Sequence, residues 1–156
     1  VLCLHEALSC STGLCSFILP VSDNQEHERD AMRQLVAFIE LVMADFVKAG
    51  ISRTQLTAKV FGLGGIALSG NQIKKNLQFI EHYLMKEQIK LLSSSTASGT
   101  FRELFFMPET GIAYLRHCAD AAETKKWSLA EREYIKNSHA VFSTRYVLFN
   151  EELSVS

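Results

Sequence analysis

The sequence predicts an α/β fold, a layered sandwich in which a mixed β-sheet is flanked by two long helices. Short apolar segments alternate along the chain with two long segments whose apolar residues recur at helical spacing. The 156 residues are most simply a single domain, which we expect to span 1–156, because a chain of this length can bury a core without disulfide or metal support.

The chain begins with two short strands, predicted over 1–7 and 14–19, since both segments are apolar and Pro20 ends the second. A helix is predicted over 26–49, and its apolar stripe must cover another surface. That stripe comprises Met32, Leu35, Val36, Ile39, Val42, Met43, Phe46 and Val47.

The ends of this helix carry signals of their own. Ser22 and Gln25 have the spacing of a capping box, and Gly50 suits the C-terminal cap. The segment 55–61 reads as the next strand, and a second helix is predicted over 71–87. The inner face of this second helix comprises Ile73, Leu77, Ile80 and Leu84. We expect both apolar stripes to lie against the sheet.

The remaining segments are mostly strand-like. Residues 89–95 and 101–107 are joined through "TASGT", and the turn "PETG" leads into a further strand over 112–118. A capping-box spacing predicts a short helix over 128–137. The segment 140–149 is rich in β-branched and aromatic residues and predicts a final strand.

The glycine-rich stretch "KVFGLGGIALSG" tests whether the chain binds a nucleotide. Gly62, Gly64 and Ala67 match a loose dinucleotide fingerprint, G-x-G-x-x-A. A dinucleotide loop needs its helix to begin among the glycines, however, and Ser69–Asn71 delay the helix here. The strand that follows ends in serines where such a site places an acid for the ribose. The glycines therefore indicate a backbone turn, and we expect no cofactor.

A winged-helix DNA-binding domain is a weaker alternative. The segments 51–61 and 71–87 would be its helix pair and 89–107 its wing. Lys74, Lys75 and Lys86 would contact phosphates. The acidic residues on the same helix and the net charge of −1 oppose this alternative, so we expect no nucleic-acid partner.

The four cysteines, Cys3, Cys10, Cys15 and Cys118, lack the paired spacing of a structural zinc site. We therefore expect buried free thiols and no bound metal. The chain has no apolar run of the roughly 18 residues that cross a bilayer, so no membrane insertion is expected. A cytoplasmic location is the default for such a chain.

A family resemblance rests on the order of four stretches. "GLCSFILP", "LTAKVFG", "IKKNLQFIEHYLMKEQIKLL" and "FRELFFMPETG" occur in the order and spacing of the chemotaxis protein CheD family. The chain resembles this family of chemoreceptor glutamine deamidases over about 1–116, which makes the part from about 117 a C-terminal extension.

The resemblance implies an α/β sandwich and a cysteine-hydrolase chemistry. A thiolate attacks the carboxamide of a receptor glutamine, a histidine manages the protons, and water clears the thioester. The product is a glutamate, and ammonia is released. The implied partners are the cytoplasmic domains of chemoreceptors and a CheC-type phosphatase, which again places the protein in the cytoplasm.

The resemblance also assigns positions to the site. It puts the nucleophilic cysteine a couple of residues before Val1, outside this chain, and the family histidine on Ser16. A serine hydroxyl does not deprotonate a thiol near neutral pH. Asn76 falls on the helix asparagine of the family and Arg102 on the arginine before the closing strand, so both are expected to be binding residues.

Three residues are weaker candidates for the chemistry. Cys3 and Cys15 are thiols near the expected site, and His5 could supply an imidazole, although each is more commonly a packing residue. Two hypotheses therefore stay open. The chain belongs to a receptor deamidase whose nucleophile lies outside it, or it is a catalytically inactive CheD-like docking module that binds receptors or a CheC-type phosphatase.

Overall fold

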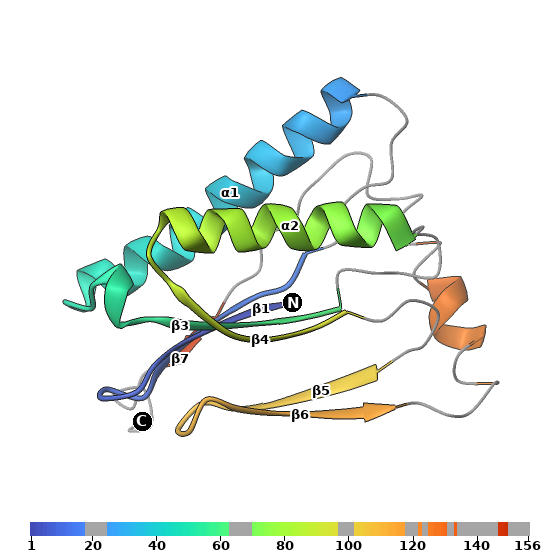
Figure 1. Cartoon of the computed structure of the whole chain (residues 1–156). Coiled ribbons are helices and arrows are strands. Elements are labelled where there is room, and N and C mark those ends of the chain that lie inside the picture. The colour runs from blue at the N-terminus through green and yellow to red at the C-terminus, as the bar shows by residue number, and fades with distance from the viewer. Residues whose placement is uncertain are drawn as a thin grey trace.

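The computed structural model describes residues 1–17, 25–62, 70–96, 102–117, 122, 125–130, 133 and 147–149. These residues form three layers: two helices, a five-stranded mixed sheet beneath them, and a two-stranded hairpin on the other face of the sheet (Figure 1). The predicted α/β sandwich is confirmed, with both long helices on the same face of the sheet.

The elements follow one another in the predicted alternation. In chain order they are β1 (Leu2–Glu6), β2 (Ser11–Cys15), α1 (Gln25–Lys48), the 3-10 turn η1 (Arg53–Gln55), β3 (Thr57–Phe61), α2 (Gly70–Lys86), β4 (Lys90–Ser95), β5 (Arg102–Met107), β6 (Ile112–His117) and β7 (Val147–Phe149). The main sheet has the order β4-β3-β1-β2-β7, in which β3 and β4 are parallel and the other pairs antiparallel.

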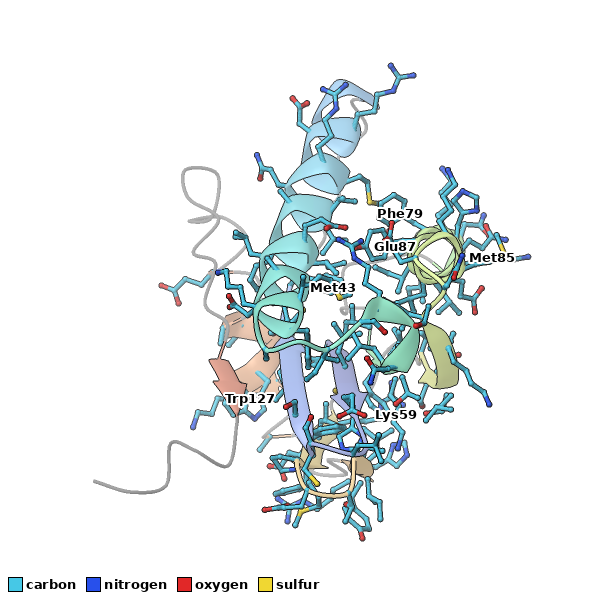
Figure 2. The ribbon with its side chains drawn as sticks, turned by 90° about the vertical axis from the view of Figure 1, so that its left-hand side faces the viewer. Met43, Lys59, Phe79, Met85, Glu87 and Trp127 are labelled. Atoms are coloured by element: carbon cyan, nitrogen blue, oxygen red, sulfur yellow. The ribbon has the colours of Figure 1, made fainter. Side chains whose placement is uncertain are left out.

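The core lies between the helices and the main sheet. Most of the predicted stripe of α1 and of the inner face of α2 is buried, with Met32, Val36 and Leu77 partly buried, and Met43 lies on the inner side of α1 (Figure 2). Gly13 of β2 allows α1 to approach, since a Cβ there would lie 2.6 Å from a Val42 methyl group. Val47 was expected in the stripe but is 54% exposed, because it lies at the outer edge of the last helical turn.

The helices end in the same hydrogen-bonded cap. At the end of α1, Gly50 has a φ of 80°, its N–H donates to the Val47 carbonyl, and Ile51 N–H donates to the Phe46 carbonyl. The predicted glycine cap is thus confirmed. At the end of α2, Gln88 takes the same role with a φ of 58°.

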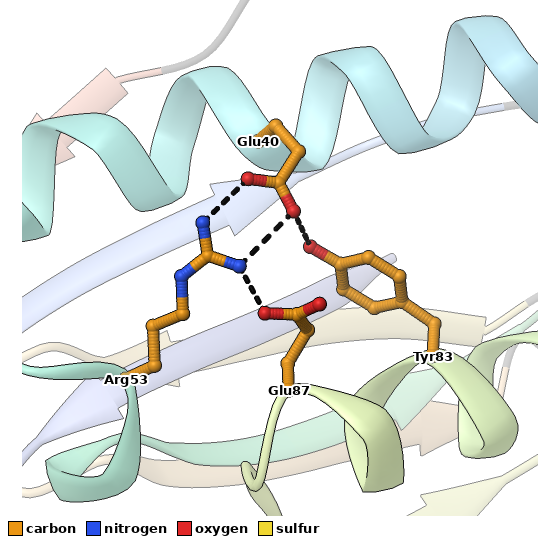
Figure 3. Close-up of polar contacts among 4 residues, drawn as sticks. All are labelled: Glu40, Arg53, Tyr83 and Glu87. Carbon is orange, nitrogen blue, oxygen red and sulfur yellow. Dashed lines mark hydrogen bonds and ion pairs between the residues drawn. The ribbon is translucent and has the colours of Figure 1, made fainter.

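A polar cluster ties the C-terminal end of α2 to α1 and η1 (Figure 3). The Arg53 guanidinium donates to both carboxylate oxygens of Glu40, at 2.6 and 3.2 Å, and forms an ion pair with Glu87. Tyr83 OH donates at 2.6 Å to Glu40 Oε1, the oxygen that also accepts from Arg53 Nη1. These contacts join three elements that are distant in sequence.

Two strands were predicted with wrong bounds. The third begins at Thr57 and not at residue 55, because Arg53–Gln55 form η1. The second strand is β2 at Ser11–Cys15, not 14–19. The polar residues 9–12 resemble a loop, but their side chains have partners. Ser9 Oγ donates to the Glu6 carboxylate and lies 2.9 Å from Ser11 Oγ, and Thr12 Oγ1 donates to the Pro108 carbonyl. The turn before β2 is held by the Glu6 carboxylate, which accepts from the N–H of Leu8 and Ser9.

The winged-helix alternative is also wrong. Residues 51–61 hold η1 and β3 in place of a helix, and residues 89–107 form no hairpin, because β4 pairs with β3 and β5 pairs with β6. Residues 125–130 are already helical, so that helix begins before Ser128. Part of the final predicted strand is present as β7, and residues 140–146 lie outside the described residues.

The start of α2 agrees with the turn interpretation of the glycine stretch. Gly62 has a φ of 81°, and α2 begins only at Gly70. The intervening residues 63–69, with Gly64 and Ala67, lie outside the described part of the chain. None of the described helices is both long and apolar enough to span a bilayer.

Candidate functional site

The candidate site is at one end of the strands of the main sheet, where β1 begins and β2, β3 and β4 end. We call this end of the sheet the site edge. Leu2 pairs with Cys15 on one side and with Val60 on the other. Val1 continues the ladder toward β3, since its backbone nitrogen donates to the Phe61 carbonyl at 2.7 Å and its carbonyl accepts from Phe61 N–H at 2.9 Å. The N-terminus accordingly lies beside the end of β3 (Figure 1).

Ser16 lies at this edge. It follows β2 directly, one register step beyond the Leu2–Cys15 pair, so it stands across the ladder from Val1. Its side chain is exposed. The resemblance assigned the family histidine to Ser16 and the nucleophilic cysteine to a position just before Val1. In the structure, Ser16 and the backbone of Val1 are neighbours across the β1–β2 ladder.

Arg102 joins the hairpin to the same edge. Its guanidinium donates to Ser95 Oγ at 2.7 Å and to the Ser95 carbonyl at 2.9 Å. Ser95 ends β4 and pairs with Phe61, and its carbonyl also accepts from Gly62 N–H. Arg102 thus links the start of β5 to the ends of β3 and β4. The partner Ser95 was missed as a site residue, although parallel strands end at the same edge and β4 ends in three serines.

Asn76 is a buried polar residue of α2, 6% exposed. It lies in the second turn of a helix whose first residue, Gly70, follows β3 after the glycine stretch. The Asn76 side chain is therefore buried, whereas the Ser16 side chain is exposed to solvent.

The two thiols nearest the edge are poor nucleophiles. Cys15 faces the helices and Cys3 faces the hairpin layer, and both are almost completely buried. Burial raises the pKa of Cys3 to about 11 and that of Cys15 to about 12. Both are therefore protonated near neutral pH, whereas attack on an amide requires the thiolate.

His5 lies at the other end of β1, beneath the hairpin turn. A Cβ at Gly111 would be 2.7 Å from its Nδ1, so the imidazole fills the space that the glycine leaves. Its Nε2 is buried and has no hydrogen-bond partner in the part of the chain that the structure describes. Burial lowers the pKa of His5, against the opposing effects of the Pro108 carbonyl and Glu6. His5 shares a sheet face with Cys3 but is remote from Ser16.

Among the described residues, no group of three or more His, Cys, Asp or Glu side chains is placed to hold a metal ion. At this edge the N–H groups of Phe61 and Gly62 and the guanidinium of Arg102 donate to other groups of the protein, whereas the Ser16 side chain is exposed and its hydroxyl can donate to or accept from a ligand.

A family model described as "CheD chemotactic sensory transduction" matches residues 18–117, nearly two thirds of the chain. A probable chemoreceptor glutamine deamidase CheD of Agrobacterium fabrum is 35% identical over 125 residues, which cover 80% of this chain and 68% of that protein. This chain belongs to the CheD family.

Further CheD relatives agree with this assignment. The probable chemoreceptor glutamine deamidase CheD of Bordetella parapertussis is 30% identical over 135 residues, covering 84% of this chain. The one from Caulobacter vibrioides is 32% identical over 113 residues, covering 70% of this chain. The chain spans 63% and 59% of the lengths of these two relatives.

Proposed function

We propose that this chain acts on chemoreceptors as the receptor-binding and site-forming part of a CheD glutamine deamidase. The observation that supports this most is the shared edge at which Val1, Ser16 and the Arg102–Ser95 pair meet. The relatives named above are probable chemoreceptor glutamine deamidases, so the substrate would be a glutamine side chain of a receptor.

The reaction would convert an amide to an acid. A cysteine thiolate bonds to the carboxamide carbon, the C–N bond breaks, and the nitrogen leaves as ammonia after gaining a proton. Water then attacks the thioester, which releases the glutamate carboxylate and returns the thiol. This sequence needs a base beside the thiol, at the position where this chain has Ser16.

The chain's own residues would bind and orient the amide. An amide offers a carbonyl acceptor and two N–H donors, and the exposed Ser16 hydroxyl can pair with either. Arg102 would be a positioning residue, since its donors are engaged with Ser95 and hold the hairpin against the edge. Asn76 would support the same edge from within α2. No cofactor is required for these steps.

The proposed partners are the cytoplasmic domains of chemoreceptors, and a CheC-type phosphatase is a second proposed partner, on the basis of the family resemblance alone. The cytoplasm is the proposed location, since the substrate domains lie there. The described cysteines Cys3, Cys10 and Cys15 are free thiols, which agrees with a reducing compartment.

A second candidate function is a docking module that binds receptors without hydrolysis. The buried, protonated thiols and the serine at position 16 favour it. Both candidates predict that the chain itself does not deamidate a receptor fragment.

The test compares the chain with a variant that carries an added Gly-Ser-Cys segment before Val1, at the family spacing, together with Ser16→His. Each is incubated with a chemoreceptor cytoplasmic fragment while ammonia release and the receptor mass are followed. Activity only in the variant supports the deamidase proposal, and replacing the added cysteine by alanine is the control. Binding without activity in both samples supports the docking module. Comparable activity in the unmodified chain would falsify the assignment and direct attention to Cys3, Cys15 and His5.

A further inference from the structure

The outer face of the β5–β6 hairpin exposes four large apolar side chains. Phe105 is opposite Tyr114, and Met107 is opposite Ile112, so all four project from the same face of the hairpin. Their exposed fractions are 51% for Phe105, 45% for Met107, 44% for Ile112 and 57% for Tyr114. We name these four residues the hairpin face.

This face is distinct from the packed side of the hairpin. The alternate residues, Leu104, Phe106, Ala113 and Leu115, are each only partly exposed and project toward the main sheet. An ordinary solvated hairpin carries polar residues on its outer side. The hairpin face has the opposite character and offers on the order of 400 Å² of apolar surface, since a half-exposed large side chain contributes about 100 Å².

The end of the hairpin face nearest the candidate site is charged. Glu103 and Arg116 are opposite each other, two register steps beyond Phe105 and Tyr114 and therefore on the same face, and they form an ion pair. The Arg116 guanidinium lies 5.9 Å from the centre of the Phe105 ring. A partner that covers the apolar residues would therefore meet an ion pair at this end, and its guanidinium and carboxylate can hydrogen-bond the carbonyl and the NH2 group of an amide side chain.

The hairpin face also leads directly to the site edge. β5 begins at Arg102, whose guanidinium is bound to Ser95, and Phe105 follows three residues later. At the usual rise of a strand this places the aromatic ring about 10 Å along the strand from Arg102. A folded receptor that presents one glutamine at the edge must rest its flanking residues on the surface beside it.

We propose that the hairpin face docks the chemoreceptor segment that carries the target glutamine, through apolar receptor side chains beside that glutamine. This rests on the proposed function. The area favours such an occupant over a second copy of the chain, because a two-fold dimer through this face alone would bury about 800 Å², roughly half of a standard interface. A small apolar contact bordered by one ion pair suits a substrate that must be released after each reaction.

The test measures the dissociation constant for a chemoreceptor cytoplasmic fragment encoded in the same genome. The variant combines Phe105→Thr and Tyr114→Thr, since threonine is accepted in strands. The matched control combines Leu8→Ser and Met85→Gln, two exposed apolar residues, 90% and 67% exposed, that lie in the β1–β2 turn and on α2. Met85 projects outward from α2, away from the hairpin layer (Figure 2).

We expect binding to weaken at least tenfold in the hairpin variant and to stay unchanged in the control. Equal binding by all three proteins would overturn the hairpin proposal and leave the proposed function standing. No binding by the unmodified chain would contradict both. Tyr114→Thr alone, checked for a native melting temperature, separates lost contact from lost folding. A photo-crosslinking residue at position 114 should capture the receptor fragment, and one at position 8 should not. Sedimentation that shows a dimer lost only in the hairpin variant would assign the face to self-association and overturn the proposal.

Discussion

Cysteine accessibility differs sharply among the described thiols. Cys3 and Cys15 are buried in strands, where burial raises the pKa of both, while Cys10 is partly exposed in the β1–β2 turn. At pH 8 we expect an alkylating reagent to modify Cys10 in the native protein and to leave Cys3 and Cys15 unmodified until denaturant is added. Peptide mass spectrometry measures each site. Native labelling of Cys15 at the rate of Cys10 would show that the site edge opens readily.

The cap of α2 is a second feature of the residue scale. Gln88 has a φ of 58°, where a side chain is unfavourable, and glycine occupies the equivalent position after α1. Gln88→Gly should therefore increase the free energy of unfolding by about 0.5–1 kcal/mol. Gly50→Ala should lower it, because the φ of 80° disfavours a Cβ. Urea denaturation measures both, and a destabilised Gln88→Gly protein would contradict this account.

Among the elements, α1, η1 and α2 are joined by the Glu40–Arg53–Tyr83–Glu87 cluster. Burial of Glu40 would raise its pKa, but the hydrogen bonds from Arg53 and Tyr83 outweigh it and hold the pKa of Glu40 below its ordinary value of 4.5. The cluster therefore stabilises the fold fully above about pH 4.5, and this contribution is lost as the pH falls through the lower, folded-state pKa.

A double-mutant cycle with Glu40→Gln and Arg53→Met measures this contact. We expect a coupling energy of about 0.5–1 kcal/mol at pH 7, since both side chains are about one third exposed and solvent weakens the pair. The coupling should decrease as the pH falls below 4.5. A coupling energy of zero at pH 7 would show that the Glu40–Arg53 contact does not stabilise the junction of α1 and η1.

The two long helices were predicted to within about one residue, because apolar periodicity over many residues outweighs local ambiguity. The bounds of strand β2 were predicted wrongly, because Ser11 and Thr12 have the composition of a loop. They are strand residues only because of contacts with residues far away in the sequence, such as Pro108. The same limit applied to the site. Ser16 could be placed by resemblance, but the Arg102–Ser95 pair depends on β4 lying parallel to β3. No local pattern contains that information.

At the scale of the whole molecule, the hairpin layer is attached to the main sheet around His5. Lys59 Nζ donates to the Gly111 carbonyl at 2.6 Å, and the imidazole packs against the same glycine. Lys59 lies between the sheet and the hairpin (Figure 2). Because Lys59 adds a positive charge near the buried imidazole, the contact between the hairpin and the main sheet favours the neutral form of His5.

The stability of the protein should therefore fall as the pH is lowered from 7 toward 5. Burial lowers the pKa of His5 below its ordinary value of 6.5, so the unfolded chain takes up a proton first. The stabilisation is complete above pH 6.5 and is lost as the pH falls through the folded-state pKa. A His5→Leu variant should show a flatter dependence in thermal melts between pH 7 and 5. Identical slopes for both proteins would exclude His5 as the titrating group.

The strand β7 pairs with β2, so residues near the two ends of the chain are neighbours in the main sheet. A ribosome releases residues 11–15 long before it releases residues 147–149. Until then the outer edge of β2 presents unpaired backbone groups to any other extended segment, including one from another nascent chain. The order of synthesis therefore leaves this edge open until residues 147–149 emerge, and a chaperone that shields extended edges would have its greatest effect before that point.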